Sequence, residues 1–188
     1  MSLELVKADV SAADMESVKA SIPDFAKDVR LNFGAILGED ATPDLTRAQQ
    51  LGTALSCAYA VRNAELMVAL ERLAIAEGQE ALLAPAKAAA SIMAMNNVYY
   101  RFVHLVHDEE ISKLPAKLRM NVIANPGIAK TDFELMALAV SAINGCGMCM
   151  ESHVQELAKH GVSKLAMQSA VRIAAVLASV SQSLALAA

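Results

Sequence analysis

The chain has 188 residues and a formal net charge of −4, with 55% hydrophobic and 19% charged residues. This length suits one domain, and the scattered basic residues form no footprint for a nucleic acid. The composition is dominated by Ala, Leu, Val and Met, which favours closely packed helices. The mean hydropathy of +0.38 is high, so we expect part of the apolar surface to be buried between subunits.

The pattern of apolar and polar residues predicts an all-α fold with no strand. Ser11 and Asp14 resemble a cap for a first short helix that ends before Pro23. The turn at 125–127 is marked by an Asn-Pro-Gly sequence. Further helices are expected at 24–37, 42–62, 64–77, 80–95, 97–109, just after Pro115, at 131–144, from the Cys146 segment to 160, and from Ser163 onward.

The last apolar run, 166–188, is long enough to raise the question of a membrane span. Its polar residues are spaced as a stripe, which favours an internal helix and no membrane: Gln168, Arg172, Ser179, Ser181 and Gln182. Residues 1–5 lack the basic and apolar blocks of a signal peptide. Three cysteines without such a signal predict a cytoplasmic protein, in which a CxxC motif is catalytic or metal-binding.

An internal repeat is suggested when 54–56 is placed on 139–141, because the hydrophobic phase then continues without a gap. It predicts a single domain, 1–188, with half-repeats of about 44–109 and 129–188 packed about a pseudo-twofold axis. Only the second copy would carry chemistry. In this register Val61, Ala64, Val68 and Gln49 stand in the places of Cys146, Cys149, His153 and Glu134.

Cys146 and Cys149 are the most informative residues, since they open a predicted helix just after Gly145. Two thiols three residues apart in a first helical turn have Cα atoms roughly 5 Å apart, which suits a disulfide. A helix N-terminus favours anions and so lowers the pKa of a thiol below its free value of about 8.5. Spacing and position together predict thiol–disulfide chemistry.

His153 lies one helical turn after Cys149 and therefore on the same face. If the two helices around Gly145 fold back as a hairpin, Glu134 reaches a depth comparable to that of His153. A carboxylate orients an imidazole and raises its basicity, so we expect a relay from Glu134 through His153 to Cys149. Glu134 has a second interpretation, because Thr131 and Glu134 also fit a capping box.

Other chemistries fit the motif less well. A zinc site on Cys146, Cys149 and His153 lacks a fourth ligand, and Met150 stands where a c-type haem motif needs histidine. A thioredoxin fold would require strands. His104 and His107 could form a metal pair, although a solvated helix end is the simpler interpretation.

Four further segments accompany the CxxC-x3-His motif: residues 95–101, 121–127, 133–135 and 139–146. Together with the motif they resemble the AhpD alkylhydroperoxidase family, which belongs to the carboxymuconolactone decarboxylase-like superfamily. The similarity covers the chain from about residue 20 and is strongest over 118–160. Met148 is a departure, because some members of the family carry histidine inside the motif.

The resemblance implies an AhpD-like homotrimer that reduces hydroperoxides without a bound cofactor. Cys149 would be the peroxidatic thiolate that becomes a sulfenic acid, with His153 and Glu134 as its proton relay. Cys146 would donate a proton, close the disulfide with Cys149 and, as the more exposed thiol, form a mixed disulfide with the peroxiredoxin AhpC. Electrons would come from dihydrolipoamide on a lipoyl-bearing acyltransferase that is served by dihydrolipoamide dehydrogenase.

Two other functions fit the sequence. A carboxymuconolactone decarboxylase-type lyase could use the same helical scaffold, with the cysteines incidental to its reaction. A redox adaptor could pass electrons from lipoyl groups to a peroxiredoxin without reacting with peroxide itself. The coincidence of the paired thiols with the relay residues favours the peroxidase.

Overall fold

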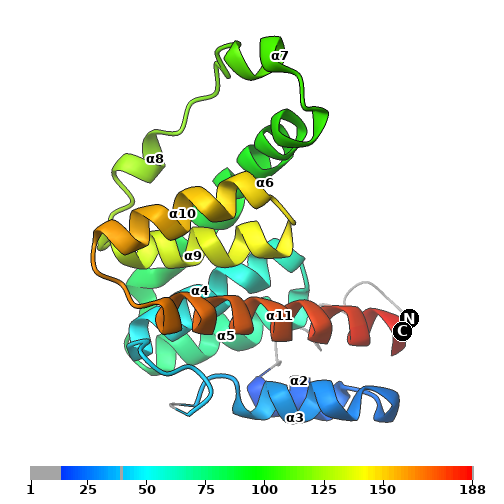
Figure 1. Cartoon of the computed structure of the whole chain (residues 1–188). Helices are drawn as coiled ribbons and strands as arrows, with labels where there is room; N and C mark the ends of the chain where they lie inside the picture. Colours follow the sequence, from blue (N-terminus) through cyan, green and yellow to red (C-terminus); the bar gives the residue numbers. More distant parts are fainter. Residues whose placement is uncertain (1–13, 39, 188) are drawn as a thin grey trace.

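A computed structural model describes residues 14–38 and 40–187, and in that part of the chain it contains helices and no strand. The predicted all-α fold is confirmed (Figure 1). The first helix is capped by the Asp14 side chain, which accepts a hydrogen bond from the Ser17 backbone N–H. Ser11 lies outside the described residues.

The helices follow one another with short connections. The α-helices are α2 (Met15–Ser21), α3 (Lys27–Ala35), α4 (Arg47–Val61), α5 (Ala64–Ala76), α6 (Leu83–Val106), α7 (Glu109–Lys113), α8 (Asn121–Ala124), α9 (Lys130–Ile143), α10 (Gly147–Lys159) and α11 (Lys164–Ala187). Two short 3-10 helices, η1 (Asp24–Ala26) and η2 (Glu80–Leu82), precede α3 and α6.

Helix α6 corrects the prediction of two helices at 80–95 and 97–109. It runs without a break from Leu83 to Val106 and ends at His107, whose φ is +51°. Asn96 and Asn97 are weak helix formers, yet both are buried in the middle of α6. Packing and a hydrogen bond from Asn97 to Ser141 of α9 therefore override their local preference.

Two other helix starts differ from the prediction. Helix α4 begins at Arg47 rather than Thr42, because Thr46 and Gln49 form a reciprocal capping box. Thr42 is instead buried, and its hydroxyl accepts a hydrogen bond from Gln50. No helix begins at Pro115, which lies in the extended segment between α7 and α8.

The core is centred on α4, which packs against α5, α6, α9 and α11. The hairpin of α9 and α10 lies along one side of this bundle, while α2 and α3 lie on the other (Figure 1). The segment with α7 and α8 extends away from the body of the molecule before the chain returns into α9 (Figure 1). Fully buried side chains such as Leu51, Leu55 and Phe133 fill the centre. Each such burial contributes roughly 1.5–3 kcal/mol.

Helix α11 is the one helix in the described part of the chain that is long and apolar enough to cross a membrane by length and composition. About a third (33%) of its most apolar window is buried within the protein. Ile173, Leu177 and Val180 on this helix belong to the main core. These three side chains attach α11 to the core, as expected for the internal helix that the polar stripe predicted.

Six of the helices after residue 46 form two sets of three with similar lengths, and the short helices α7 and α8 lie between the sets. Helices α4, α5 and α6 have 15, 13 and 24 residues, and α9, α10 and α11 have 14, 13 and 24. Asn63 caps α5 as Cys146 caps α10, and each accepts a hydrogen bond from the third residue that follows. The pseudo-twofold relation and the half-repeat boundaries remain predictions.

Aligning the two sets of helices by these caps gives a different register from the gap-free alignment that places residues 54–56 on 139–141. Counted from the cap, Leu66 stands where Cys149 stands, Leu70 where His153 stands, and Leu51 where Glu134 stands. All three leucines are fully buried. The first set of helices therefore fills with apolar packing the positions that carry polar or reactive side chains in the second.

Cys57 gives a test of the α4 core. Burial raises the pKa of its thiol to about 12, whereas an unfolded cysteine ionises near 9.0. Between these values the unfolded chain binds fewer protons, so the free energy of unfolding should fall by about 3 kcal/mol as pH rises from 8 to 11. We expect Cys57→Ala to remove this decrease, measured by urea unfolding from pH 8 to pH 11. Parallel pH curves for the two proteins would contradict a buried, protonated Cys57.

Candidate functional site

The turn between α9 and α10 sets the position of the dithiol. Helix α9 ends at Ile143, and Gly145 follows with φ of +67°, a conformation that strains any residue with a side chain. The Cys146 backbone N–H then donates to the carbonyl oxygen of Ser141, at 3.1 Å. The chain is thereby reversed so that Cys146 caps α10 and faces back along α9.

Cys146 and Cys149 form a disulfide, with Cα atoms 5.3 Å apart. The backbone N–H of Cys149 also donates to Cys146 Sγ, at 3.3 Å. Both sulfurs therefore lie at the first turn of α10, where unpaired backbone N–H groups favour a negative charge. The predicted juxtaposition of the two thiols is what the structure shows.

Glu134 and His153 lie on facing helices and are joined by a 2.7 Å contact between Oε2 and Nδ1. Both side chains are buried, with relative exposures of 4% and 8%. The capping-box interpretation of Glu134 is wrong, because α9 begins at Lys130 with Ala129 as its cap and no side-chain hydrogen bond. A carboxylate at Nδ1 holds the imidazole in one orientation and leaves Nε2 for proton exchange.

A cavity of about 650 Å³ brings these groups together. It is lined by Met93, Asn96, Tyr100, Met120, Ile123, Ala124, Lys130, Glu134, Met148, Cys149, Ser152, His153 and Glu156. Its walls come from α6, α8, α9 and α10, so residues far apart in sequence meet there. Mostly apolar walls with a few polar groups are typical of a site for a small organic molecule.

The structure reverses the expected exposure of the two cysteines. Cys149 lines the cavity and is 7% exposed, whereas Cys146 does not line it and is fully buried. The reason is the capping position of Cys146, which turns its side chain under the first turn of α10. The prediction that Cys146 is the more exposed sulfur is therefore wrong for this disulfide form.

Lys130 and Glu156 form an ion pair at the edge of the cavity. The hydrogen bond from Lys130, with a further one from Lys159, lowers the pKa of Glu156 to about 2. This pair was not predicted from the sequence. Lys130 lies four residues before Glu134, and Glu156 lies three after His153, so helical spacing already placed both beside these two residues.

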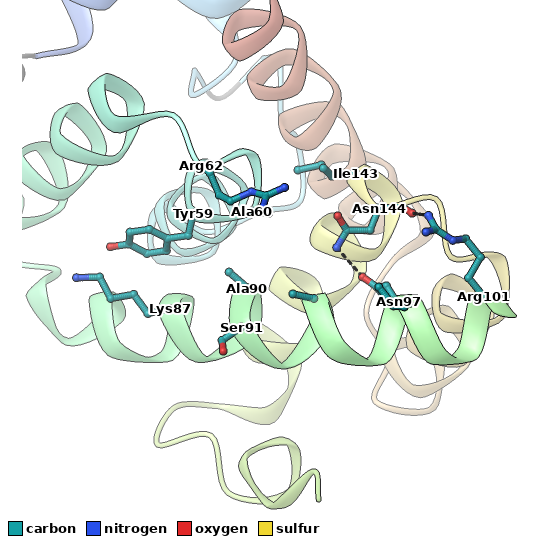
Figure 2. A pocket seen from close by; sticks show the side chains of 12 residues that line it. Tyr59, Ala60, Arg62, Lys87, Ala90, Ser91, Asn97, Arg101, Ile143 and Asn144 are labelled. Atoms are coloured by element: carbon teal, nitrogen blue, oxygen red, sulfur yellow. Dashed lines mark hydrogen bonds between the residues drawn. The ribbon is translucent and has the colours of Figure 1, made fainter. Parts of the chain in front are cut away.

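A second cavity, of about 690 Å³, contains none of the predicted site residues (Figure 2). Along its wall Asn144 donates to the Asn97 side-chain oxygen at 2.9 Å, and Arg101 donates to the Asn144 carbonyl oxygen at 2.6 Å (Figure 2). Asn97 in turn donates to the Ser141 hydroxyl at 2.9 Å. This network anchors the turn that leads into Cys146.

Among the residues that the structure describes, no group of three or more His, Cys, Asp or Glu side chains could hold a metal ion. The rings of His104 and His107 lie 6.3 Å apart at the end of α6. His104 faces the dithiol helix, since a Cβ on Gly147 would lie 3.9 Å from its Nε2.

Comparison with known proteins places the chain in a family. Residues 109–188 match the carboxymuconolactone decarboxylase family, and this span contains the disulfide and the Glu134–His153 pair. The fold and the site therefore define an all-helical protein with the domain of that family, in which a disulfide lies beside a histidine–carboxylate pair in one cavity.

Two relatives that align with most of the chain narrow the family further. "Alkyl hydroperoxide reductase AhpD" of Coxiella burnetii (strain RSA 493 / Nine Mile phase I) is 54% identical over 168 residues, which cover 89% of this chain and 95% of that protein. The protein of the same name from Rhodopseudomonas palustris (strain BisA53) is 52% identical over 170 residues, covering 90% and 92%. The chain belongs to the AhpD family of alkyl hydroperoxide reductases.

The Glu134–His153 contact leads to a prediction on thiol reactivity. Glu134→Gln keeps the shape of the side chain but removes the charge that supports a protonated imidazole, so less Cys149 thiolate should form. We expect the reduced variant to be alkylated by iodoacetamide at pH 7 about tenfold more slowly at Cys149. Mass spectrometry of the labelled peptides measures this, with buried Cys57 as an internal control that stays unlabelled. Equal alkylation rates would contradict a role for Glu134 in forming the thiolate.

Proposed function

We propose that this protein is a cytoplasmic, thiol-dependent peroxidase that reduces organic hydroperoxides through Cys149 and Cys146. The observation that carries the proposal is the placing of Cys149 and the Glu134–His153 pair in one largely apolar cavity. The name of the relatives, alkyl hydroperoxide reductase, supports the same reaction.

In the first step, His153 accepts the proton of Cys149, while Glu134 stabilises the resulting imidazolium. The thiolate attacks the distal oxygen of the hydroperoxide and the O–O bond breaks. The sulfur is oxidised to a sulfenic acid that keeps the distal O–H group. The alkoxide that leaves takes the proton from His153 and becomes an alcohol, so that the imidazole is ready for the next cycle.

In the second step, Cys146 resolves the sulfenic acid. Its sulfur attacks Cys149 Sγ, an S–S bond forms, and the oxygen leaves as water with the thiol proton. The disulfide between Cys146 and Cys149 is what this step would produce, which supports the proposal. Because Cys146 caps the same turn that holds Cys149, the two sulfurs meet without rearrangement of the helix axes.

Return to the dithiol requires two electrons and two protons, and we assign them to dihydrolipoamide. Its two thiols can open the disulfide through a mixed disulfide and leave as a cyclic disulfide. The apolar cavity walls suit the alkyl stem of such a donor. A lipoyl-bearing acyltransferase and dihydrolipoamide dehydrogenase would supply these electrons, with no cofactor bound to this chain.

The reduced protein would also pass electrons to the peroxiredoxin AhpC. If Cys146 forms that mixed disulfide, its complete burial requires the first turn of α10 to open toward the partner. We also propose that the chain assembles into a homotrimer. Exposed apolar side chains on the second half of α6 support burial of this surface between subunits, since Val98, Phe102 and Leu105 are 63%, 52% and 62% exposed.

Peroxide reactivity of the cysteine variants tests the peroxidase. Pre-reduced protein mixed with cumene hydroperoxide should show rapid thiol oxidation, and Cys149→Ser should abolish it because the attacking sulfur is gone. Cys146→Ser should react once and accumulate a sulfenic acid that dimedone traps. Stopped-flow absorbance and mass spectrometry measure both, with Cys57→Ser as a control at the wild-type rate.

Peroxide reduction by Cys149→Ser at the wild-type rate would contradict this assignment. Rapid exchange of the disulfide with lipoyl groups, without any reaction of the reduced protein with peroxide, would instead establish the adaptor. Turnover of a lactone acid that survives the loss of both cysteines would favour the lyase.

The electron donor gives a second prediction. In a coupled assay with dihydrolipoamide dehydrogenase, NADH oxidation in the presence of hydroperoxide should depend on added lipoamide, because a dithiol donor closes its own disulfide and drives the exchange. Glutathione at the same thiol concentration should support much slower turnover. Equal turnover with both thiols would contradict a lipoyl-specific donor.

A further inference from the structure

Asn96 has a buried side-chain oxygen without a hydrogen-bond partner among the described residues, and this residue has no role in the reaction steps above. Its side chain is only 5% exposed, and Oδ1 has no hydrogen-bond partner in the described part of the chain. Thr53 Oγ1 is the other buried side-chain atom of this kind there. Burying an acceptor without a partner lowers stability, so such an atom in an enzyme calls for a partner that arrives during function.

Asn96 lies at the reacting sulfur. It lines the same cavity as Cys149, Glu134 and His153, and its backbone carbonyl oxygen is 3.9 Å from Cys149 Sγ. Thr53, by contrast, lies on α4 and lines none of the cavities described above. Of the two residues that hold these atoms, only Asn96 lines the cavity. Its Oδ1 is itself covered, so the amide has to rotate to present this oxygen to a ligand.

The neighbouring Asn97, also on α6, has hydrogen bonds to both its amide nitrogen and its amide oxygen. Asn97 lines the second cavity, where its amide donates to Ser141 and its oxygen accepts from Asn144 (Figure 2). Helix α6 thus presents two consecutive asparagines to two different cavities. The one that supports the turn is fully engaged, and the one at the dithiol retains an unused acceptor.

An amide oxygen requires a donor, and a hydroperoxide brings one on its distal oxygen. The Glu134 oxygen nearest the ring is engaged by His153, and Glu156 is engaged by Lys130. We propose that Asn96 Oδ1 accepts a hydrogen bond from the distal O–H of the hydroperoxide beside Cys149. This inference rests on the proposed peroxidase function and adds Asn96 to it as a substrate-binding residue.

The contact fits the balance of the oxygen-transfer step. The distal oxygen keeps its proton as the O–O bond breaks, so the hydrogen bond to Asn96 passes unchanged from the hydroperoxide to the sulfenic acid on Cys149. Asn96 neither gains nor loses a proton. It fixes the distal oxygen against the sulfur, which leaves the leaving oxygen to be protonated by His153.

Asn96→Leu tests the proposal, since leucine has a similar volume and no acceptor. The readout is the ratio of the rate with cumene hydroperoxide to the rate of iodoacetamide alkylation of Cys149, which corrects for any change in thiolate. We expect this ratio to fall about tenfold, as loss of one ordinary hydrogen bond predicts. The melting temperature should stay level or rise, because an unpartnered buried acceptor has been removed.

Two further variants keep the test decisive. Thr53→Val removes the other unpartnered atom and should leave the ratio unchanged, and the melting temperature of Asn96→Leu shows whether that variant is folded. Asn96→Ala should lower the ratio as Asn96→Leu does, so a folding failure of one variant is covered by the other. Wild-type ratios in Asn96→Leu and Asn96→Ala would overturn the inference and leave the peroxidase intact. A reduced wild-type protein that does not react with hydroperoxide would overturn both.

Discussion

The buried contact between Glu134 and His153 is the constraint on which the site depends. Each side chain is almost fully removed from water, and an ionisable group in that position is costly unless it is paired. Each finds its partner on the facing helix, so α9 and α10 have to pack in one register. That register also places Cys149, one turn before His153, at the wall of the cavity.

The first set of helices has buried leucines where the second set has the polar pair Glu134 and His153. Where α9 and α10 carry Glu134 and His153, the positions at equal distance from the cap of α5 carry Leu51 and Leu70, both fully buried. Leucines stabilise a hairpin by burial alone and need no partner. The second hairpin replaces part of that packing by a polar pair, and the remaining helices hold it in place through the shared core around α4.

Helix α6 connects the two sets in function as well as in packing. It supplies Met93, Asn96 and Tyr100 to the dithiol cavity, and on another face Asn97 anchors the turn before Cys146. The site is therefore formed by α6 as well as by the α9–α10 hairpin that carries the CxxC motif. A helix that begins more than sixty residues before the motif forms one wall of the cavity and contacts Cys149 Sγ.

The sequence by itself determined the features that depend on short spacings. Cys146, Cys149 and His153 fall within two turns of one helix, and the reversal at Gly145 brings Glu134 to the depth of His153. Helical geometry alone therefore predicted the cysteine pair and the contact between Glu134 and His153. The all-helical fold followed from the same periodicity. These relations lie within one helix or across a single tight turn.

Tertiary structure decided the rest, because contacts between distant residues set the energies. The burial of Asn96 and Asn97 against α9 and α10 keeps α6 continuous through a pair of weak helix formers. The packing around α10 covers Cys146 and leaves Cys149 at the cavity, a choice that the symmetric spacing of two cysteines does not contain. Which buried oxygen is left without a partner is likewise known only once every neighbour is in place.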